Sequence, residues 1–295
     1  MSNTRTLFCF GLGYSALALI ERLRRQDGAA NWLFAGTSRN AEKCAKLAAQ
    51  GIDMQLFDGT APLSKPDSLH QADHVLISAP SEASGDGDPV LRQHADDLAR
   101  RRDLRWIGYL STTGVYGDQG GAWVDESMPM TPSQQRGRRR AEAEAAWFAL
   151  GARHGLPVHS FRLAGIYGPG RNTLESLRQG KAHRIIKPGQ YFSRIHVADI
   201  AQVLHASMLK PNPGAAYNVA DDEPAPPQEV VAHAAGLLGI TPPPEVPFEL
   251  AEMTPMARSF YAENKRVSNR RIKQELGVTL LYPTYREGLA ALLQD

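Results

Sequence analysis

The chain of 295 residues has little cysteine, no long apolar run and almost no net charge. Its two cysteines, Cys9 and Cys44, cannot form a disulfide framework, so a reducing compartment is expected. No run approaches the roughly 18 apolar residues that span a bilayer. A net charge of +2 points to no strongly charged partner. The composition predicts a soluble globular protein, either one large α/β domain or a domain with a smaller annex.

One N-terminal segment has some character of a secretion signal. Residues 7–19 are fairly apolar, and Ala16-Leu17-Ala18 resembles a signal-peptidase site. However, Arg5 is the only charge ahead of this run, and glycines interrupt it. Cleavage would also remove the glycine turn described below. We therefore expect a cytoplasmic protein with no membrane partner.

Short apolar runs alternate with helical patterns through the first 165 or so residues, as βαβ units require. Strands are predicted at 6–10, 31–36, 53–57, 74–78, 104–110 and 157–163, and helices at 16–26, 41–49, 89–101 and 138–154. Gly155 follows the last of these helices, as a C-cap does. The right-handed crossover rule makes this a doubly wound parallel sheet of Rossmann type, with ligands at the carboxyl ends of its strands.

Beyond residue 165 the alternation loosens. Prolines and glycines gather at 168–190, 211–214, 224–227 and 242–247. Strand character at 194–197 and 217–220 mixes with short helices near 198–209, 227–238, 267–276 and 285–293. We predict a Rossmann domain over 1–165 and a mixed α/β substrate-binding subdomain over 166–295, with some exchange of strands and helices back to the first.

A glycine turn follows the first predicted strand and opens the first helix. Residues 11–16 read Gly-Leu-Gly-Tyr-Ser-Ala, which fits the G-x-G-x-x-G/A fingerprint of dinucleotide binding. The first glycine permits a tight turn, the second lets the backbone approach a pyrophosphate, and the small third residue allows close helix–strand packing. Free N–H groups at the helix start face the anion. The predicted contacts are Gly11, Gly13, Tyr14, Ser15 and Ala16; a bare strand–turn–helix is the alternative.

The end of the second strand selects the cofactor. An NAD site would place an acid about 20 residues after the glycines, to hold the ribose 2′-hydroxyl. There is none between 31 and 40; the strand instead ends in Thr37, Ser38 and Arg39, which suit a 2′-phosphate. NADP is therefore predicted over NAD, unless Arg39 is an ordinary exposed residue at a helix start.

Two further loops are predicted to border the cofactor. Asp58 follows the third strand and could accept a hydrogen bond from the adenine amino group, or be a turn residue. Ala79 and Pro80 end the fourth strand and should pass close to the cofactor, the alternative being a simple turn.

Three more segments complete a recognisable order: Ser-Thr-Thr-Gly-Val-Tyr-Gly at 111–117, Arg-Leu-Ala-Gly-Ile-Tyr-Gly-Pro-Gly at 162–170, and Arg-Ile-His-Val-Ala-Asp-Ile-Ala at 194–201. With the glycine turn at 11–16, the chain resembles the short-chain dehydrogenase/reductase superfamily over almost its full length. It looks closest to the extended and atypical members grouped as the NAD-dependent epimerase/dehydratase family. The resemblance implies a Rossmann sheet with a small substrate-binding subdomain.

The resemblance also implies an active site, half of which is missing. Thr112 matches the hydroxyl residue that orients the substrate. In the family, a tyrosine acts as acid/base and a lysine four residues on holds the nicotinamide ribose. Arg136 and Arg140 stand at those two positions, and neither Tyr nor Lys occurs between 118 and 166. A guanidinium cannot take a proton at neutral pH, but it can bind ribose, phosphate or carboxylate.

Other residues are weaker candidates. Tyr116, Tyr167 and Tyr191 are conceivable replacements for the missing tyrosine, although the first two fit better as structural parts of their motifs. Arg194 and Tyr116 are predicted to contact the substrate. Asp199, in the same segment as His196, is expected to be structural, as such segments are in the resembling family.

Arginine clusters at 100–102 and 136–140 could suggest a nucleic-acid surface. Acidic residues interleave with them and no stacking platform accompanies them, so a solvated face is favoured and no nucleic-acid partner is expected. The nine histidines lack metal-ligand spacing, so no metal site is predicted. A small-molecule substrate and a monomer or homodimer are expected.

The leading hypothesis is an NADP-binding oxidoreductase or epimerase acting on a small polar substrate such as a nucleotide-linked sugar. Thr112 would orient the reacting oxygen, and Arg140 would retain the binding part of the lysine's role. The alternative is a catalytically inactive NADP-binding module that reports redox state to a partner.

Overall fold

The structure, a computed structural model, describes residues 4–80 and 87–294. The chain divides into two compact units that interleave along the sequence. The sheet unit comprises Met1–Thr112, Arg138–Arg162 and Ile200–Tyr217, and the second unit comprises Thr113–Gly137, Leu163–Asp199 and Asn218–Asp295. The division at residue 165 stays a prediction.

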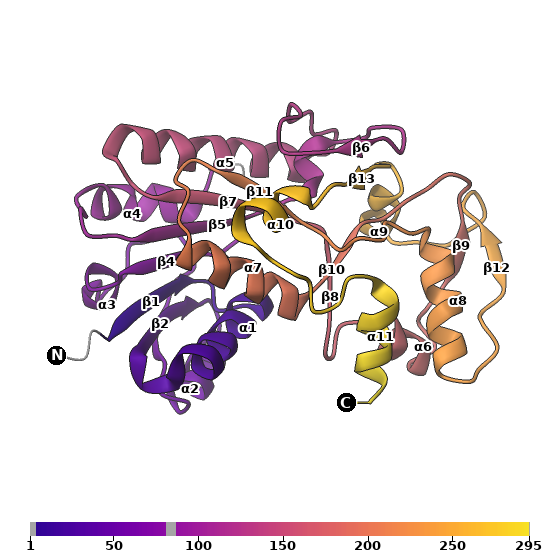
Figure 1. Ribbon diagram of the computed structural model, residues 1–295, viewed down its shortest axis with the longest axis horizontal. Coiled ribbons are helices and arrows are strands. Elements are labelled where there is room, and N and C mark those ends of the chain that lie inside the picture. Colours follow the sequence, from indigo (N-terminus) through magenta and orange to yellow (C-terminus); the bar gives the residue numbers. More distant parts are fainter. Residues whose placement is uncertain (1–3, 81–86, 295) are drawn as a thin grey trace. The chain divides into compact units, whose positions relative to one another are not determined.

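The sheet unit is built on seven strands in the order β11-β7-β5-β4-β1-β2-β3 (Figure 1). They are β1 (Arg5–Phe10), β2 (Trp32–Ser38), β3 (Asp53–Leu56), β4 (His74–Ile77), β5 (Trp106–Thr112), β7 (Val158–Leu163) and β11 (Ala216–Val219). Strand β1 pairs in parallel with both β2 and β4, so the order reverses between β1 and β4. The predicted Rossmann-type α/β fold is confirmed, and the carboxyl edge at this reversal is where such sheets bind ligands.

Helices cover both faces of this sheet. They are α1 (Tyr14–Leu23), the π turn η1 (Arg24–Gly28), the 3₁₀ turn η2 (Ala29–Asn31), α2 (Ala41–Ala48), α3 (Asp67–His70), α4 (Pro89–Ala99), α5 (Gln135–His154) and α7 (Val197–Leu209). One apolar core joins Val75 and Ile107 of the strands to Val90 of α4 and Trp147 of α5. On the opposite face, the Trp106 indole donates a hydrogen bond to a serine of α7. Alternate residues of β5 therefore point to opposite helical layers.

Local sequence sets several helix ends. Asp88 caps α4 by accepting hydrogen bonds from Val90 N and Leu91 N at 2.9 and 3.1 Å, and Pro89 occupies the first helical position. Gly155 follows α5 at a φ of +71°, as the sequence predicted. Helix α5 begins at Gln135, three residues before the predicted start, so that it includes Arg136.

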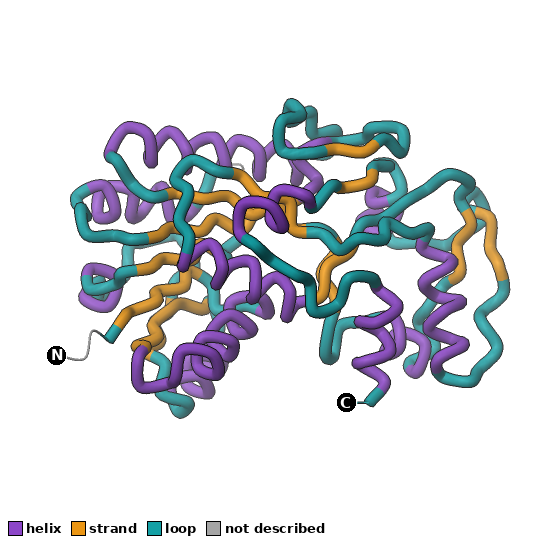
Figure 2. The backbone as a smooth tube through the Cα atoms, in the orientation of Figure 1, coloured by secondary structure: helices purple, strands orange, loops and turns teal. Residues whose placement is uncertain are grey.

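The second unit consists of short elements joined by long loops (Figure 2). Its strands are β6 (Trp123–Val124), β8 (Gly165–Tyr167), β9 (Arg184–Ile186), β10 (Arg194–His196), β12 (Glu245–Pro247) and β13 (Arg266–Val267). They form three parallel pairs: β10 with β8, β12 with β9, and β13 with β6. Its helices are η3 (Thr113–Tyr116, 3₁₀), α6 (Thr173–Arg178), α8 (Pro227–Leu237), α9 (Pro255–Phe260), α10 (Arg270–Leu276) and α11 (Tyr285–Leu293).

Two apolar clusters support the second unit. The larger joins α6, α8 and α11 through residues such as Leu174, Ala234 and Leu289. The smaller gathers around Ile185 and Tyr261. Within the described residues, no helix combines the length and the apolar content needed to cross a membrane.

Candidate functional site

The glycine turn lies where β1 ends and α1 begins. Gly11 has a φ of +84°, and a Cβ there would lie only 2.9 Å from the backbone nitrogen of Ala79. The turn is held from below by β2, because Gly11 N donates to the Thr37 hydroxyl at 2.9 Å and Leu12 N to the Thr37 carbonyl at 2.8 Å. Only glycine satisfies both the backbone angle and this close approach.

The start of α1 has the features of an anion site. Its N-cap is Gly13, which provides no side chain to cap the first amides. A Cβ at Gly13 would meet one atom within 4 Å, the Ser78 hydroxyl at 3.9 Å, so the space above it is open. Ser15 and Ala16 are buried against the sheet. Helix N-termini carry unsatisfied N–H groups and a partial positive charge, which together attract anions.

The three residues predicted to select NADP lie at the end of β2 and differ in exposure. Thr37 is buried, and its hydroxyl holds the glycine turn. The Ser38 hydroxyl accepts a hydrogen bond from Asn40 N at 3.2 Å, just before α2. Arg39 is exposed, and among the described residues no hydrogen bond or ion pair of its guanidinium is found. Arg39 is thus the member of this group that is available to an external anion.

The remaining predicted cofactor contacts lie in two loops of the same unit. The Asp58 carboxylate accepts hydrogen bonds from the backbone and hydroxyl of Thr60 at 2.9 and 2.7 Å, which lowers the pKa of Asp58. Asp58 is therefore a turn residue with one carboxylate oxygen engaged. Ala79 lies against Gly11, and Pro80 beside it is exposed. The contact of Asp58 with an adenine stays a prediction.

Thr112 and Arg140 belong to the sheet unit. Thr112 is half-buried at the last position of β5. Arg140 lies on α5, and its guanidinium is 5.0 Å from the ring centre of Tyr109 on β5. Tyr109 in turn stacks on Trp147 at 6.3 Å, and both rings are fully buried. A buried aromatic pair thus supports the Arg140 guanidinium through a cation–π contact.

A buried ion pair fixes the rotation of α5. Glu144, one turn after Arg140, is fully buried and accepts hydrogen bonds from Arg162 Nε at 3.0 Å and from an Arg162 terminal nitrogen at 2.6 Å. Arg162 lies on β7, so the pair joins α5 to the sheet. Residues four apart share one face of a helix. Arg140 therefore faces the sheet because Glu144 is anchored there.

Arg136, which is predicted to stand at the position of the family's tyrosine, has a different environment. Its guanidinium lies 4.5 Å from the ring centre of Phe260 on α9, within the second unit. The ring itself is 48% exposed. Arg136 therefore has an aromatic partner far from β5 in the sequence, whereas Arg140 has one on β5.

Arg194 opens β10 in the second unit and is half-buried. One of its terminal nitrogens donates to the carbonyls of Phe192 and Ala225 at 2.8 and 3.2 Å. Burial lowers its pKa, and the carboxyl of Asp221 opposes this change. Burial raises the pKa of Asp221 well above its ordinary value, and Arg194 partly offsets the rise. Arg194 thus has internal partners, and a contact with a substrate stays a prediction.

The candidate tyrosines are engaged inside the second unit. The buried Tyr116 donates its hydroxyl hydrogen to Asn218 Oδ1 at 2.8 Å. Tyr167 donates to the Thr284 carbonyl at 3.4 Å, and burial raises its pKa, which is the wrong direction for an acid/base group. The ring of Tyr191 packs on Arg266 at 5.2 Å. A substrate contact of Tyr116 stays a prediction.

Two other expectations can be placed in the structure. The fully buried Asp199 accepts hydrogen bonds from Leu281 N and Tyr282 N at 2.6 and 3.1 Å, which gives it a structural role. Burial raises the pKa of the Cys9 thiol, as for a small apolar core residue. Sequence reasoning missed Tyr109 and Glu144. The signal for both was positional, since they lie three residues before Thr112 and four after Arg140.

Comparison with known proteins agrees with this class of fold. Residues 93–220 match the NAD dependent epimerase/dehydratase family. Protein YeeZ of Escherichia coli (strain K12) is 30% identical over 246 residues, which cover 79% of this chain and 84% of YeeZ. A functionally unknown conserved protein from Silicibacter pomeroyi is 54% identical with a TM-score of 0.88, covering 99% of each chain. A dTDP-glucose 4,6-dehydratase from Bacillus anthracis, solved in complex with NAD, is 16% identical with a TM-score of 0.77, covering 98% of this chain and 96% of that one, and shares the fold.

The fold and the glycine turn thus define a Rossmann-type member of the short-chain dehydrogenase/reductase class. The chain belongs to the NAD-dependent epimerase/dehydratase family.

Proposed function

We propose that this chain binds NADP at the glycine turn and acts as an oxidoreductase or epimerase on a small polar substrate such as a nucleotide-linked sugar. The observation that carries the proposal is the turn itself. Gly11 has a positive φ and closely approaches Ala79, and α1 starts without a side-chain cap. The residues present fit a pyrophosphate, which would receive hydrogen bonds from the first amides of α1.

The choice of NADP rests on Arg39. A guanidinium binds a phosphate bidentately, and Arg39 lies exposed at the end of β2, where a cofactor's adenosine ribose is held in this fold. The test is a titration of NADPH and NADH followed by cofactor fluorescence. We expect NADPH to bind about tenfold tighter or more, and Arg39→Ala to remove most of that preference. Arg25→Ala, in the π turn η1 that follows α1, is the matched control. Tighter NADH binding by the unaltered chain would overturn the preference.

The proposed chemistry assigns two residues beside the nicotinamide. When bound, the nicotinamide exchanges a hydride with a substrate carbon. The Thr112 hydroxyl would orient the reacting oxygen of the substrate. Arg140 stays protonated, so it would hold the ribose or an anionic group rather than move a proton. Arg194 and Tyr116 would contribute to holding the substrate.

The catalytic proposal is tested by measuring cofactor reduction and oxidation against a panel of nucleotide sugars. Thr112→Val preserves the shape of the side chain and removes its hydroxyl. We expect this variant to lose about a hundredfold in kcat, the range typical of a lost positioning or acid–base contact. Full activity in Thr112→Val would remove Thr112 from the mechanism.

One observation favours a second candidate function, a catalytically inactive NADP-binding module. Both positions of the family's proton-transfer pair hold arginines, Arg136 and Arg140, which cannot exchange protons at neutral pH. Such a module would keep cofactor binding and lack turnover. Exhaustive screening of bound NADPH against carbonyl compounds separates the two functions, since oxidation by any of them identifies an enzyme.

A further inference from the structure

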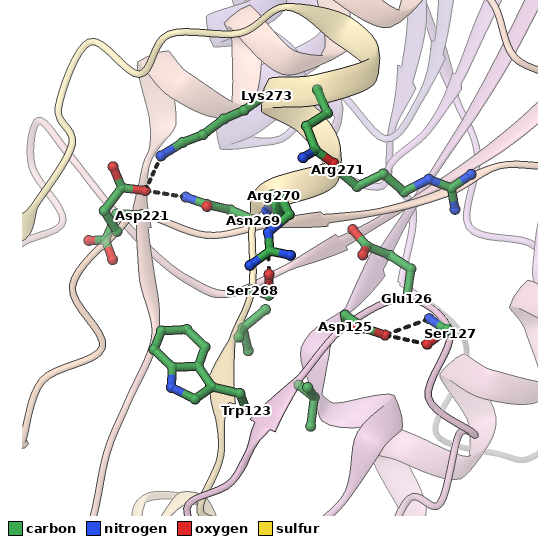
Figure 3. A pocket seen from close by; sticks show the side chains of 14 residues that line it. Trp123, Asp125, Glu126, Ser127, Asp221, Ser268, Asn269, Arg270, Arg271 and Lys273 are labelled. Atoms are coloured by element: carbon green, nitrogen blue, oxygen red, sulfur yellow. Dashed lines mark hydrogen bonds and ion pairs between the residues drawn. The ribbon is translucent and has the colours of Figure 1, made fainter.

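The second unit contains an open pocket of about 810 Å³ that takes no part in the proposed function (Figure 3). It lies between the strand pair β6–β13, the loop after β6 and the start of α10. Its volume is in the range of small-molecule sites. Its lining includes one tryptophan, three cations and four acids: Trp123, Arg270, Arg271, Lys273, Asp125, Glu126, Asp221 and Asp222.

Protein donors engage all four acids of this pocket. Asp125 accepts hydrogen bonds from Ser127, from its backbone at 2.9 Å and from its hydroxyl at 2.5 Å. Glu126 accepts one from Asn218 N at 2.7 Å. Asp222 is held by Asn269 and Lys273. These contacts hold the three carboxylates in fixed positions in the lining of the pocket.

The fourth acid, Asp221, accepts a hydrogen bond from Glu223 N at 3.3 Å and is only 1% exposed. Burial raises its pKa well above the ordinary value. Burial also raises the pKa of Glu126. Asp221 therefore presents almost none of its surface to a ligand in the pocket.

The cations of the pocket are not equally engaged. Lys273 pairs with Asp222, and Arg271 pairs with Glu275 at 2.7 Å. Arg270 is exposed, and within the described residues its guanidinium has no hydrogen bond. Its one described side-chain interaction is with the charge of Asp125, which it helps to keep ionised. Arg270 is thus the cation of this pocket that can bind a ligand without breaking a hydrogen bond or a close ion pair.

Trp123 supplies an aromatic surface beside this cation. The residue is 51% exposed, which is unusual for so large an apolar side chain. The guanidinium of Arg266 lies 5.5 Å from the centre of its ring. Arg266 lies over one face of the ring, and half of the residue is exposed, so part of the indole is accessible to a ligand. Figure 3 shows Trp123, Arg270 and Glu126 around the same hollow.

We propose that this pocket is a second ligand site, which binds a planar ring carrying an anionic group, with the ring on Trp123 and the anion on Arg270. Stacking on an aromatic ring tolerates many planar ligands, and a guanidinium favours phosphate or carboxylate. The site lies wholly within the second unit. It does not depend on dinucleotide binding at the glycine turn.

The test uses AMP as the probe, with the full chain and calorimetry, in the presence of saturating NADPH. We expect saturable AMP binding, and binding of adenosine or inorganic phosphate at least tenfold weaker. Trp123→Ala and Arg270→Ala should each weaken AMP about tenfold, while Trp123→Phe, which keeps a ring, should stay within about threefold. Binding of AMP should also quench tryptophan fluorescence in the unaltered chain and not in Trp123→Phe.

Two controls separate this site from the cofactor site. Arg271 lines the same pocket but is already ion-paired with Glu275. Arg271→Ala should therefore leave the affinity for AMP unchanged. Arg39→Ala should alter NADPH binding and leave AMP binding unchanged. Benzoate is a second probe that distinguishes a carboxylate from a phosphate source. The proposal is overturned if neither AMP nor benzoate binds saturably up to about 5 mM. Unchanged AMP affinity in both Trp123→Ala and Arg270→Ala would overturn it equally.

Discussion

The glycine turn and helix α5 form two regions of one proposed active site, and they differ in how far they match the pattern of the family. The turn keeps every feature that backbone binding of a pyrophosphate requires: a positive φ at Gly11, a close approach to Ala79 and an uncapped α1. Helix α5 is anchored by the Glu144–Arg162 pair, but it carries guanidiniums at both positions where the proton-transfer pair is predicted. In the proposed site, cofactor binding and proton transfer would thus depend on separate regions.

Low pH should unfold both regions together, because both are built on the same sheet. Burial lowers the pKa of His74 and His159 to about 4 in the folded chain, below the ordinary 6.5. The unfolded chain therefore binds more protons between these values, and stability falls as the pH drops from about 6.5 toward 4. Each histidine contributes up to about 3 kcal/mol.

This dependence is measured by urea unfolding between pH 4 and pH 7. His159→Gln should give a shallower decline over the same range. NADPH binding should disappear in step with unfolding. Its loss at a pH where the sheet remains folded would show that the cofactor site titrates on its own.

Removing the anchor of α5 should have the next largest effect. Glu144→Leu leaves Arg162 buried without its partner, which costs about 3–5 kcal/mol. Chemical denaturation should show this as a lower midpoint. The double variant Glu144→Leu/Arg162→Met should recover most of the loss, since no uncompensated charge remains. Failure of the double variant to recover would assign the loss to packing instead.

Gly11→Ala should break the other region. The new Cβ would lie 2.9 Å from Ala79 N, at a φ that costs about 1–2 kcal/mol in any other residue. We expect NADPH affinity to fall about a hundredfold, because the turn must shift. Gly51 has a similar φ of +78°, and a Cβ added there would meet no atom within 4 Å. Gly51→Ala therefore controls for the backbone penalty alone. Equal NADPH binding by the two variants would contradict a role for the close approach.

The smallest effect tests the support of Arg140. Tyr109→Leu removes the ring under the guanidinium and should weaken NADPH binding about fivefold, as expected for a cation–π contact. Tyr109→Phe keeps the ring and should bind as the unaltered chain does. Thermal melting of both variants separates this effect from a loss of core packing. Equal weakening in both would point to the hydroxyl rather than the ring.

The sheet unit was largely predictable because its signals are local. The glycine turn, the apolar strands and Gly155 each fix a backbone conformation from neighbouring residues. Two boundaries differ from the prediction. Helix α1 begins at Tyr14 instead of residue 16. Strand β2 ends at Ser38 instead of residue 36, because its last residues contact the glycine turn and pair with β3.

The second unit was less predictable because its contacts are distant in sequence. Strands β6 and β13 have two residues each, too short for any alternation to appear, and they pair across more than 140 positions. The support of Arg140 by Tyr109 depends on which face of β5 meets α5, and that is decided by the Glu144–Arg162 pair. The pocket at Trp123 likewise joins segments near 125, 221 and 270.

The interleaving of the two units has a consequence for how the protein is made. Strand β11 borders β7, with Ser160 N donating to Ala215 O at 3.0 Å, yet it leaves the ribosome some fifty residues later. Until then β7 has an unpaired edge, and Trp106 lacks its partner on α7. If synthesis stopped soon after residue 165, the sheet would be left with an unpaired edge strand that is prone to aggregate. We therefore expect chaperones to bind such nascent chains until β11 has been synthesised.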